Sequence, residues 1–333
     1  MHNQVFNHET LLVAYRKLIL IRKSEEWIQK EYFKDEMKTP VHLGIGGEAI
    51  SVGVQSILPQ KTKFFGTYRN HSIFLALTEN TDSFFAELYG KVTGCGKGKA
   101  GSMHLSAPEQ GLIATSAVVA STIPVAAGAA FSNQYQGNSD PVCVFFGDGA
   151  MEEGVFWETL NFASLKKLNL LFVCEDNELA IHTHSSQRQS FLDLEKAISG
   201  FRCPFGTGDG SDVVTVMTET SQIFDEMRKK PGPAFLHFKY HRFLEHVGPL
   251  EDYKFGYRAK PENMDEKFDP ILKCRRELLR RDIPVSEIEK IDLNVDLQIQ
   301  ASIRRAQEAP FPSHTELKTD VYFKPGSPLN EGA

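Results

Sequence analysis

The sequence has no long apolar run and few cysteines, and both absences exclude classes of protein. Its longest weakly polar run, from Ser116 to Phe131, is interrupted by Pro124 and is shorter than the roughly 20 apolar residues that span a bilayer. The first ten residues, MHNQVFNHET, have no apolar centre like that of a signal peptide. We therefore expect a cytoplasmic protein without a membrane span.

The five cysteines are scattered along the chain, and none belongs to a CxxC pair. This arrangement predicts neither a disulfide framework nor a zinc site. An excess of positive charge is also missing, because 37 lysines and arginines stand against 43 aspartates and glutamates, for a net charge of −6. The balance argues against sequence-independent nucleic-acid binding, which needs a basic face.

What the sequence does contain is a clear alternation of strands and helices. Residues 141–146 (PVCVFF) and 169–175 (NLLFVCE) are apolar runs typical of strands buried on both faces. Between them, Phe156, Leu160 and Ala163 recur at helical spacing. Strand, helix and strand at this length form a βαβ unit, so the two strands should be parallel.

A second such unit joins a helix with Asp212 as its N-cap to a strand at 233–240. Helices are also expected over residues 1–37 and 270–281, and the polar end of the chain is expected to be loosely ordered. Glycine-rich joints occupy 41–49, 64–71 and 93–104. The pattern predicts an α/β fold with a doubly wound, mostly parallel sheet. Its predicted parts are an N-terminal helical arm (1–40), an α/β domain (41–260) and a C-terminal helical tail packed on it (261–333).

Two loops leave consecutive strands of the first unit, and ligands bind beyond the carboxyl ends of parallel strands. Asp148 lies in the first loop and Asn177 in the second, so both should lie on the same rim of the sheet. One carboxylate and one amide oxygen suit a hard cation such as Mg²⁺, which keeps other positions for phosphate oxygens and water. The small residues Gly149 and Ala150 would let backbone N–H groups approach that phosphate.

Taken alone, Gly147-Asp148-Gly149 could be a tight turn with Asp148 as a helix N-cap. The second loop at the right spacing favours a ligand site instead. The segment GKGKAG (96–101) fits the pattern GxGxxG, but it follows a helical stretch and not a strand. We therefore predict a loop near the site and no dinucleotide-binding turn.

Residues 147–181 resemble the thiamine diphosphate motif, in which GDG is followed by an asparagine about 30 residues later. The segments VHLGIGGEA, GTYRNH, ELYGKVTGCGKGKAGSMH, STIPVAAGAA and DPILKCRRELL resemble, in order, segments of one family. That family is the alpha subunit of the thiamine-dependent 2-oxo acid dehydrogenases of the pyruvate, branched-chain and acetoin type. The resemblance covers nearly the whole chain.

The resemblance implies a role for each matching residue. Asp148, Asn177 and the backbone carbonyl of Leu179 would ligate Mg²⁺. The matching cofactor-binding residues are Tyr68, Arg69, Ala117, Val119, Gly147, Asp148, Gly149, Ala150, Asn177 and His246. His246 and His42 match catalytic histidines, and a neutral imidazole can donate to a developing alkoxide or move a proton. Glu48 is expected to be structural. The same holds for His71, His104, His182, His184 and His241, among which His104 is the strongest candidate for a site role because its motif matches the family.

The family places the glutamate that contacts the aminopyrimidine ring of thiamine diphosphate on a beta subunit. The resemblance therefore implies an α₂β₂ heterotetramer, a small 2-oxo acid as substrate and a lipoyl-bearing acyltransferase as acceptor. Residues 242–258 lack the serine-rich stretch that is phosphorylated in some members, and Leu244-Glu245 differs from the usual pyruvate form. Acetoin cleavage and non-oxidative carbon–carbon ligation stay open as alternatives. A non-catalytic cofactor-binding subunit is the third hypothesis.

Overall fold

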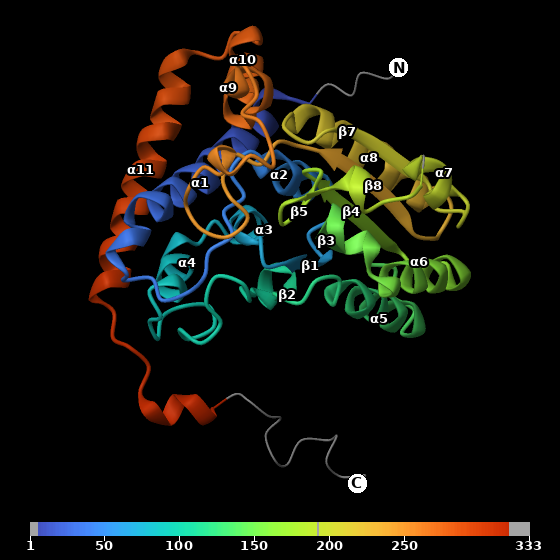
Figure 1. Cartoon of the computed structure of the whole chain (residues 1–333), viewed down its shortest axis with the longest axis horizontal. Coiled ribbons are helices and arrows are strands. Elements are labelled where there is room, and N and C mark those ends of the chain that lie inside the picture. The colour runs from blue at the N-terminus through green and yellow to red at the C-terminus, as the bar shows by residue number, and fades with distance from the viewer. Residues whose placement is uncertain (1–5, 192, 320–333) are drawn as a thin grey trace.

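A computed structural model describes residues 6–191 and 193–319. Its centre is a six-stranded sheet in which every neighbouring pair of strands is parallel (Figure 1). In spatial order the strands are β2 (Leu112–Ser116), β1 (Lys63–Thr67), β3 (Val142–Gly147), β4 (Leu170–Asp176), β8 (Ala234–Lys239) and β7 (Phe205–Asp209). A short antiparallel hairpin joins β5 (Leu179–Ala180) to β6 (Thr183–His184).

Helices cover both faces of this sheet because its central strands are apolar on both sides. In β3, Val142, Val144 and Phe146 face one core, while Cys143 and Phe145 face the other. The first core is closed by α5 (Thr122–Tyr135), α6 (Gly154–Lys166) and α7 (Leu194–Ser199). The second is closed by α1 (His8–Glu31), α2 (Glu48–Ile57), α3 (His71–Thr78), α4 (Thr81–Leu88) and α8 (Val213–Lys229). The predicted doubly wound α/β fold is confirmed.

Helices from the two ends of the chain pack against each other beside the second core (Figure 1). These C-terminal helices are α9 (Met264–Phe268), α10 (Pro270–Arg280) and α11 (Val285–Glu308). Asp269 caps α10 by accepting hydrogen bonds from the N–H groups of Ile271 and Leu272. The first helix ends at Glu31 and continues only as a 3₁₀ turn to Lys34, so it is shorter than predicted.

Most of the predicted elements are present, but the sheet strands β1, β2 and β7 and the β5–β6 hairpin are not among the predicted elements. The βαβ unit around 141–175, the Asp212 N-cap, the strand near 233–240 and the helix at 270–280 are confirmed. Most of β1 falls within the predicted joint at 64–71, and no strand is predicted at β2, because both strands are short and carry glycine or small polar residues. The three-part division at 40 and 260 stays a prediction, and the expected loose end lies beyond the described residues.

The glycine-rich loop at 94–101 surrounds a carboxylate of its own chain. Glu87 is only 1% exposed, and its Oε2 accepts hydrogen bonds from the N–H groups of Gly96 and Gly98 at 2.7 and 3.0 Å. Its Oε1 accepts two more, from Ala100 and Gly101 at 2.7 and 3.0 Å. These donors are therefore used internally, in agreement with the prediction that GKGKAG is no dinucleotide-binding turn.

The strand order locates the place where a ligand can bind. The chain passes from β1 outward to β2 on one side and then to β3 on the other, so the winding direction reverses between β1 and β3. At such a reversal the loops from the two carboxyl ends part and leave a crevice. Within residues 6–191 and 193–319, no helix is long and apolar enough to cross a membrane.

Candidate active site

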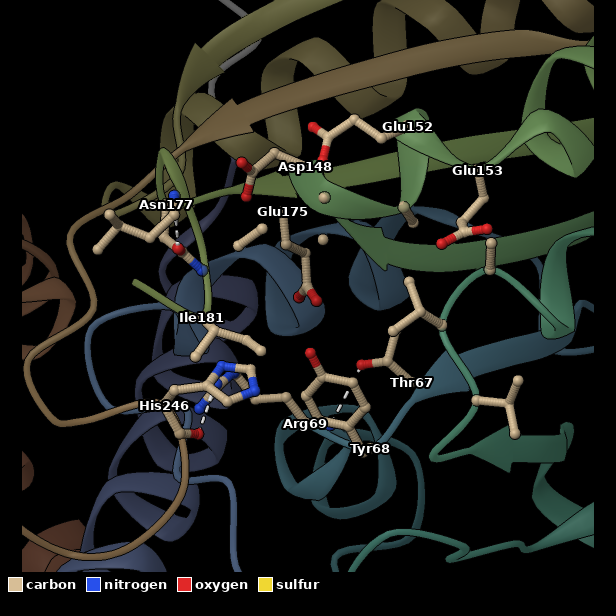
Figure 2. Close-up of a pocket in the computed structure, with 18 of the residues that line it drawn as sticks. Thr67, Tyr68, Arg69, Asp148, Glu152, Glu153, Glu175, Asn177, Ile181 and His246 are labelled. Carbon is tan, nitrogen blue, oxygen red and sulfur yellow. Dashed lines mark hydrogen bonds between the residues drawn. The ribbon is translucent and has the colours of Figure 1, made fainter. Parts of the chain in front are cut away.

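A cavity of about 260 Å³ lies at this crevice, beyond the carboxyl ends of the central strands (Figure 2). Its walls come from the segments that follow β1, β2, β3, β4 and β8, together with the β5–β6 hairpin. The polar residues lining it are Thr67, Tyr68, Arg69, Ser116, Thr122, Asp148, Glu152, Glu153, Glu175, Asn177, Tyr240 and His246.

The wall after β1 is fixed by hydrogen bonds to the backbone. The Oγ1 of Thr67 accepts from the N–H of Arg69 at 3.1 Å, and the side chain of Asn70 donates to the Thr67 carbonyl at 2.8 Å. The guanidinium of Arg69 donates to the carbonyls of Leu43 and His246. Arg69 therefore joins three segments that are far apart in the sequence and brings a fixed positive charge to the cavity.

The two predicted ligand loops meet at the same cavity. Asp148 begins the turn after β3, and its carboxyl group is almost wholly buried. Asn177 follows β4, where its Nδ2 donates to the hydroxyl of Tyr240 at 3.1 Å and its Oδ1 accepts from the N–H of Leu179 at 3.2 Å. Figure 2 shows both side chains at one end of the cavity. The juxtaposition expected from their spacing is therefore present.

The charge of the cavity suits a cation together with a phosphate-bearing ligand. Four carboxyl side chains, those of Asp148, Glu152, Glu153 and Glu175, line it with a single guanidinium. Burial, reinforced by the charge of Asp176, raises the pKa of Asp148 to about 6. Burial raises the pKa of Glu175 to about 8 despite the charge of Arg69. With Glu175 protonated near pH 7, the carboxylates of Asp148, Glu152 and Glu153 remain, and a metal cation that entered with an anionic ligand would reduce the repulsion between them.

The donor set fits a hard divalent cation, although protein ligands alone would not complete its shell. In residues 6–191 and 193–319, no group of three or more His, Cys, Asp or Glu side chains could hold a metal ion. The oxygens on offer are the carboxylate of Asp148 and the amide oxygen of Asn177, which Mg²⁺ uses together with phosphate oxygens and water. The turn after β3 and the β5–β6 hairpin come close together at Gly149. A Cβ added to Gly149 would lie 3.0 Å from the Cβ of Ala180.

Two histidines and a tyrosine form a ring cluster beside the cavity. The ring of His42 lies 4.4 Å from that of Tyr68 and 5.3 Å from that of His246, measured between centroids. Burial, together with the charge of Arg69, lowers the pKa of His42 and of His246 to about 3. Both imidazoles are therefore neutral near pH 7. Nδ1 of His42 is buried and has no hydrogen-bond partner in the part of the chain that the structure describes.

Three of the described non-glycine residues with positive φ angles lie in or next to the cavity lining. Ala120, Glu178 and Ile181 have positive φ angles of 61°, 65° and 55°, a region that residues other than glycine rarely adopt. Ala120 and Ile181 line the cavity, and Glu178 connects Asn177 to Leu179. Such conformations persist where the surrounding structure determines them, and they gather at functional sites.

The structure brings most of the predicted site residues together. Those lining the cavity are Tyr68, Arg69, Val119, Gly147, Asp148, Gly149, Ala150, Asn177, Leu179 and His246. Ala117 is outside this lining, although Ser116 and Val118 on either side belong to it. His42 reaches the site through its ring contacts.

The sequence reasoning missed Glu175, Tyr240 and Thr67. Each stands at or just beyond the carboxyl end of a strand, on the rim that was used to locate Asp148 and Asn177. The same rule, applied to every strand, would have identified Glu175 and Tyr240. Thr67 required β1 to be recognised first.

The chain is similar to known proteins along most of its length. The sequence profile of a family described as Dehydrogenase E1 component matches residues 16–315. A pyruvate dehydrogenase E1 component subunit alpha from Porphyra purpurea is 34% identical over 94% of this chain and 92% of the relative. One from Zymomonas mobilis is 30% identical over 95% of this chain and 89% of the relative. The alpha subunit of an acetoin:2,6-dichlorophenolindophenol oxidoreductase from Bacillus subtilis is 29% identical over 94% of each chain.

Proposed function

Since the chain belongs to the dehydrogenase E1 component family, we propose that it is the alpha subunit of a thiamine diphosphate-dependent enzyme that decarboxylates a 2-oxo acid. The observation that carries this proposal is the acidic cavity at the winding reversal of the sheet. Asp148 and Asn177 meet there, at the carboxyl ends of two neighbouring strands. The enzyme is an oxidoreductase acting on an oxo group, as in its relatives.

The residues of this cavity would divide the work of holding the cofactor. Mg²⁺ would take oxygens from Asp148, Asn177 and the carbonyl of Leu179, while the turn 147–150 approaches the diphosphate with its backbone. Arg69 supplies a guanidinium with planar donors suited to phosphate oxygens. Tyr68 lies in ring contact with both histidines.

When bound, thiamine diphosphate supplies the thiazolium that serves as electron sink. The chain itself supplies orientation and proton handling. Neutral His246 lines the cavity, where it would hold a proton by a ring nitrogen at the carbonyl oxygen of the substrate. Neutral His42 is in ring contact with His246 and would assist in moving that proton.

The proposal includes a beta subunit that completes the site, in an α₂β₂ heterotetramer. It is supported by exposed apolar side chains beside the mouth of the cavity. Val118 is 68% exposed and Val119 is 46% exposed, although both line the cavity. Further exposed apolar side chains on α5 and α6 are Val125, Phe131, Tyr135, Phe162 and Leu165. Exposed apolar surface of this kind is typical of protein interfaces.

A second candidate reaction is acetoin cleavage, because relatives of that type match the chain about as well as those of the pyruvate type. Carbon–carbon ligation without oxidation is a further alternative on the same cofactor. A lipoyl-bearing acyltransferase as acceptor and a cytoplasmic location stay predictions.

The test is co-expression with a beta-type chain, followed by assays with 2-oxo acids and acetoin. Each assay contains thiamine diphosphate, Mg²⁺ and 2,6-dichlorophenolindophenol as electron acceptor. We expect dye reduction with one 2-oxo acid and loss of that activity in Asp148→Ala. Dye reduction with acetoin alone would favour the second candidate. Failure of the complex to bind thiamine diphosphate would contradict both.

A further inference from the structure

One buried arginine, which the sequence reasoning did not single out, contacts the proposed metal ligand from outside the cavity lining. Nη2 of Arg188 lies 2.5 Å from Oδ2 of Asp148, and Nη1 donates to Oε1 of Glu152. Its Nε donates to the carbonyl of Thr183 at 2.9 Å. All three guanidinium nitrogens are therefore engaged, and the side chain is only 9% exposed.

These contacts connect two walls of the cavity. Asp148 and Glu152 belong to the turn after β3, whereas Thr183 belongs to the β5–β6 hairpin that brings Leu179 and Ile181 to the cavity. The turn and the hairpin also touch directly, because a Cβ added at Gly149 would lie 3.0 Å from the Cβ of Ala180. Gln189, the next residue, donates to Oε1 of Glu152 at 3.2 Å.

We propose that Arg188 is a positioning residue that fixes both the carboxylate of Asp148 and the β5–β6 hairpin for binding of the metal and the diphosphate. The inference rests on the proposed function. Either oxygen of a carboxylate can donate an electron pair to a metal. Because Arg188 hydrogen-bonds to Oδ2 of Asp148, Oδ1 remains available to a cation. Partners that hydrogen-bond a ligating carboxylate fix its direction, and their loss weakens metal affinity about 10–100-fold.

The contact differs from an ordinary surface ion pair in burial and geometry. Surface pairs contribute little because water screens them and side-chain entropy opposes them. Here the guanidinium is held at three atoms and shielded from water, so its direction is determined by the fold. Its charge also offsets that of Asp148, Glu152 and nearby Asp176, whose carboxylates would otherwise repel one another.

The test compares Arg188→Met and Arg188→Lys with the unmodified chain, each in the co-expressed complex freed of cofactor. The Mg²⁺ concentration that half-saturates thiamine diphosphate binding is measured from tryptophan fluorescence. The chain has two tryptophans, Trp27 and Trp157, and Trp157 donates to the carbonyl of Met151 at 2.8 Å in the turn after β3. Trp27→Phe in every variant leaves Trp157 as the reporter in this chain.

We expect Arg188→Met to raise that Mg²⁺ concentration about 10–100-fold. The half-saturating Mg²⁺ concentration of Arg188→Lys should lie between those of the unmodified chain and Arg188→Met, because lysine keeps the positive charge but lacks the planar set of donors. Hydrogen exchange of residues 179–184 should become faster in Arg188→Met without any cofactor present. Arg305→Met is the matched control, since Arg305 pairs with Asp82 at an exposed surface, and it should change neither quantity.

Two outcomes would overturn the inference. If Arg188→Met bound Mg²⁺ and thiamine diphosphate as the unmodified chain does, Arg188 would have no positioning role. Tighter Mg²⁺ binding by the variant would show that Arg188 competes with the metal instead. If Arg188→Met did not fold, Arg188→Lys would carry the same comparison. Failure of the unmodified complex to bind the cofactor would contradict the proposed function. That result is distinct from the two outcomes that would overturn the role of Arg188.

Discussion

Oε1 of Glu25 lies 3.0 Å from Nδ1 of His71, and both side chains are buried. The two oxygens of Glu25 also accept hydrogen bonds from the N–H of Gly44, at 3.0 and 2.9 Å. On its other side His71 contacts the hydroxyl of Ser102 at 2.7 Å. The pair therefore joins α1 to the loop that carries His42 and to the turn that carries Tyr68 and Arg69.

The first prediction concerns this buried contact. His71→Asn should lower the free energy of unfolding by about 1–3 kcal/mol, because Glu25 and Ser102 lose a buried partner. It should also weaken cofactor binding, since Arg69 is two residues away. Urea unfolding and cofactor titration measure the two effects. His104→Asn is the control, because His104 is exposed; an equal effect in both variants would contradict the prediction.

The second prediction concerns the metal. EDTA should abolish thiamine diphosphate binding, and Mg²⁺ should restore it, because four carboxyl groups line the cavity with one guanidinium. Asp148→Asn should weaken Mg²⁺-dependent binding about 100-fold by removing the ligating charge. Isothermal titration at several Mg²⁺ concentrations measures this. Asp225→Asn, a change on the exposed face of α8, should bind normally. Binding that persists in EDTA would refute the prediction.

The third prediction concerns pH. The pKa of His42 and of His246 is lowered from 6.5 to about 3. Between these values the unfolded chain binds protons that the folded chain does not, so stability is full above pH 6.5 and is lost as the pH falls. As the pH falls from about 7.5 to about 5.5, each of these histidines should lower the free energy of unfolding by on the order of 1 kcal/mol.

Urea unfolding of the cofactor-free complex at both pH values measures this loss. The double variant His42→Asn, His246→Asn should lose less stability over the same interval than the unmodified chain. Equal losses in the two proteins would mean that these histidines titrate normally in the folded state.

The fourth prediction concerns the glycine-rich loop. Glu87→Gln replaces one acceptor oxygen by an amide nitrogen, which would face two backbone N–H groups. We expect a loss of about 2–4 kcal/mol in the free energy of unfolding, because buried donors lose their partner and a charged acceptor is removed. Glu109→Gln, at an exposed position, should be nearly neutral. Unfolding in urea separates the two, and a neutral Glu87→Gln would show that the loop holds its shape without the carboxylate.

The sequence allowed the central fold to be predicted because its strongest signals are local. Apolar runs at 141–146 and 169–175 allow little but buried strands, and Asp212 caps a helix by a contact within three residues. Strand β1 gives no such signal, since only Phe64 and Phe65 of its five residues are large and apolar. Its identity comes from pairing with β2 and β3, which lie far along the chain.

The site was predictable where a residue type and a strand end coincide, as for Asp148 and Asn177. The contacts of Arg188 with Asp148 and of Glu25 with Gly44 join residues more than 15 positions apart, which no local pattern encodes. The glycine-rich loop is instructive in the opposite direction. The GxGxxG pattern alone is typical of a loop that binds an external anion, and the missing strand before it argued against that interpretation. The anion bound here is Glu87, and Gly98 and Gly101 have positive φ angles of 75° and 62°.

The winding of the sheet has a consequence for how the enzyme is made. The cavity draws its walls from Thr67 through to His246, so no early fragment of the chain contains it. A nascent chain that had been synthesised only as far as β6 would carry both metal-ligand loops, yet would lack Tyr240, which hydrogen-bonds to Asn177. Long-range pairing of this kind forms late in folding. Capture of the cofactor therefore marks a finished chain, and the bound cofactor then opposes its unfolding by mass action.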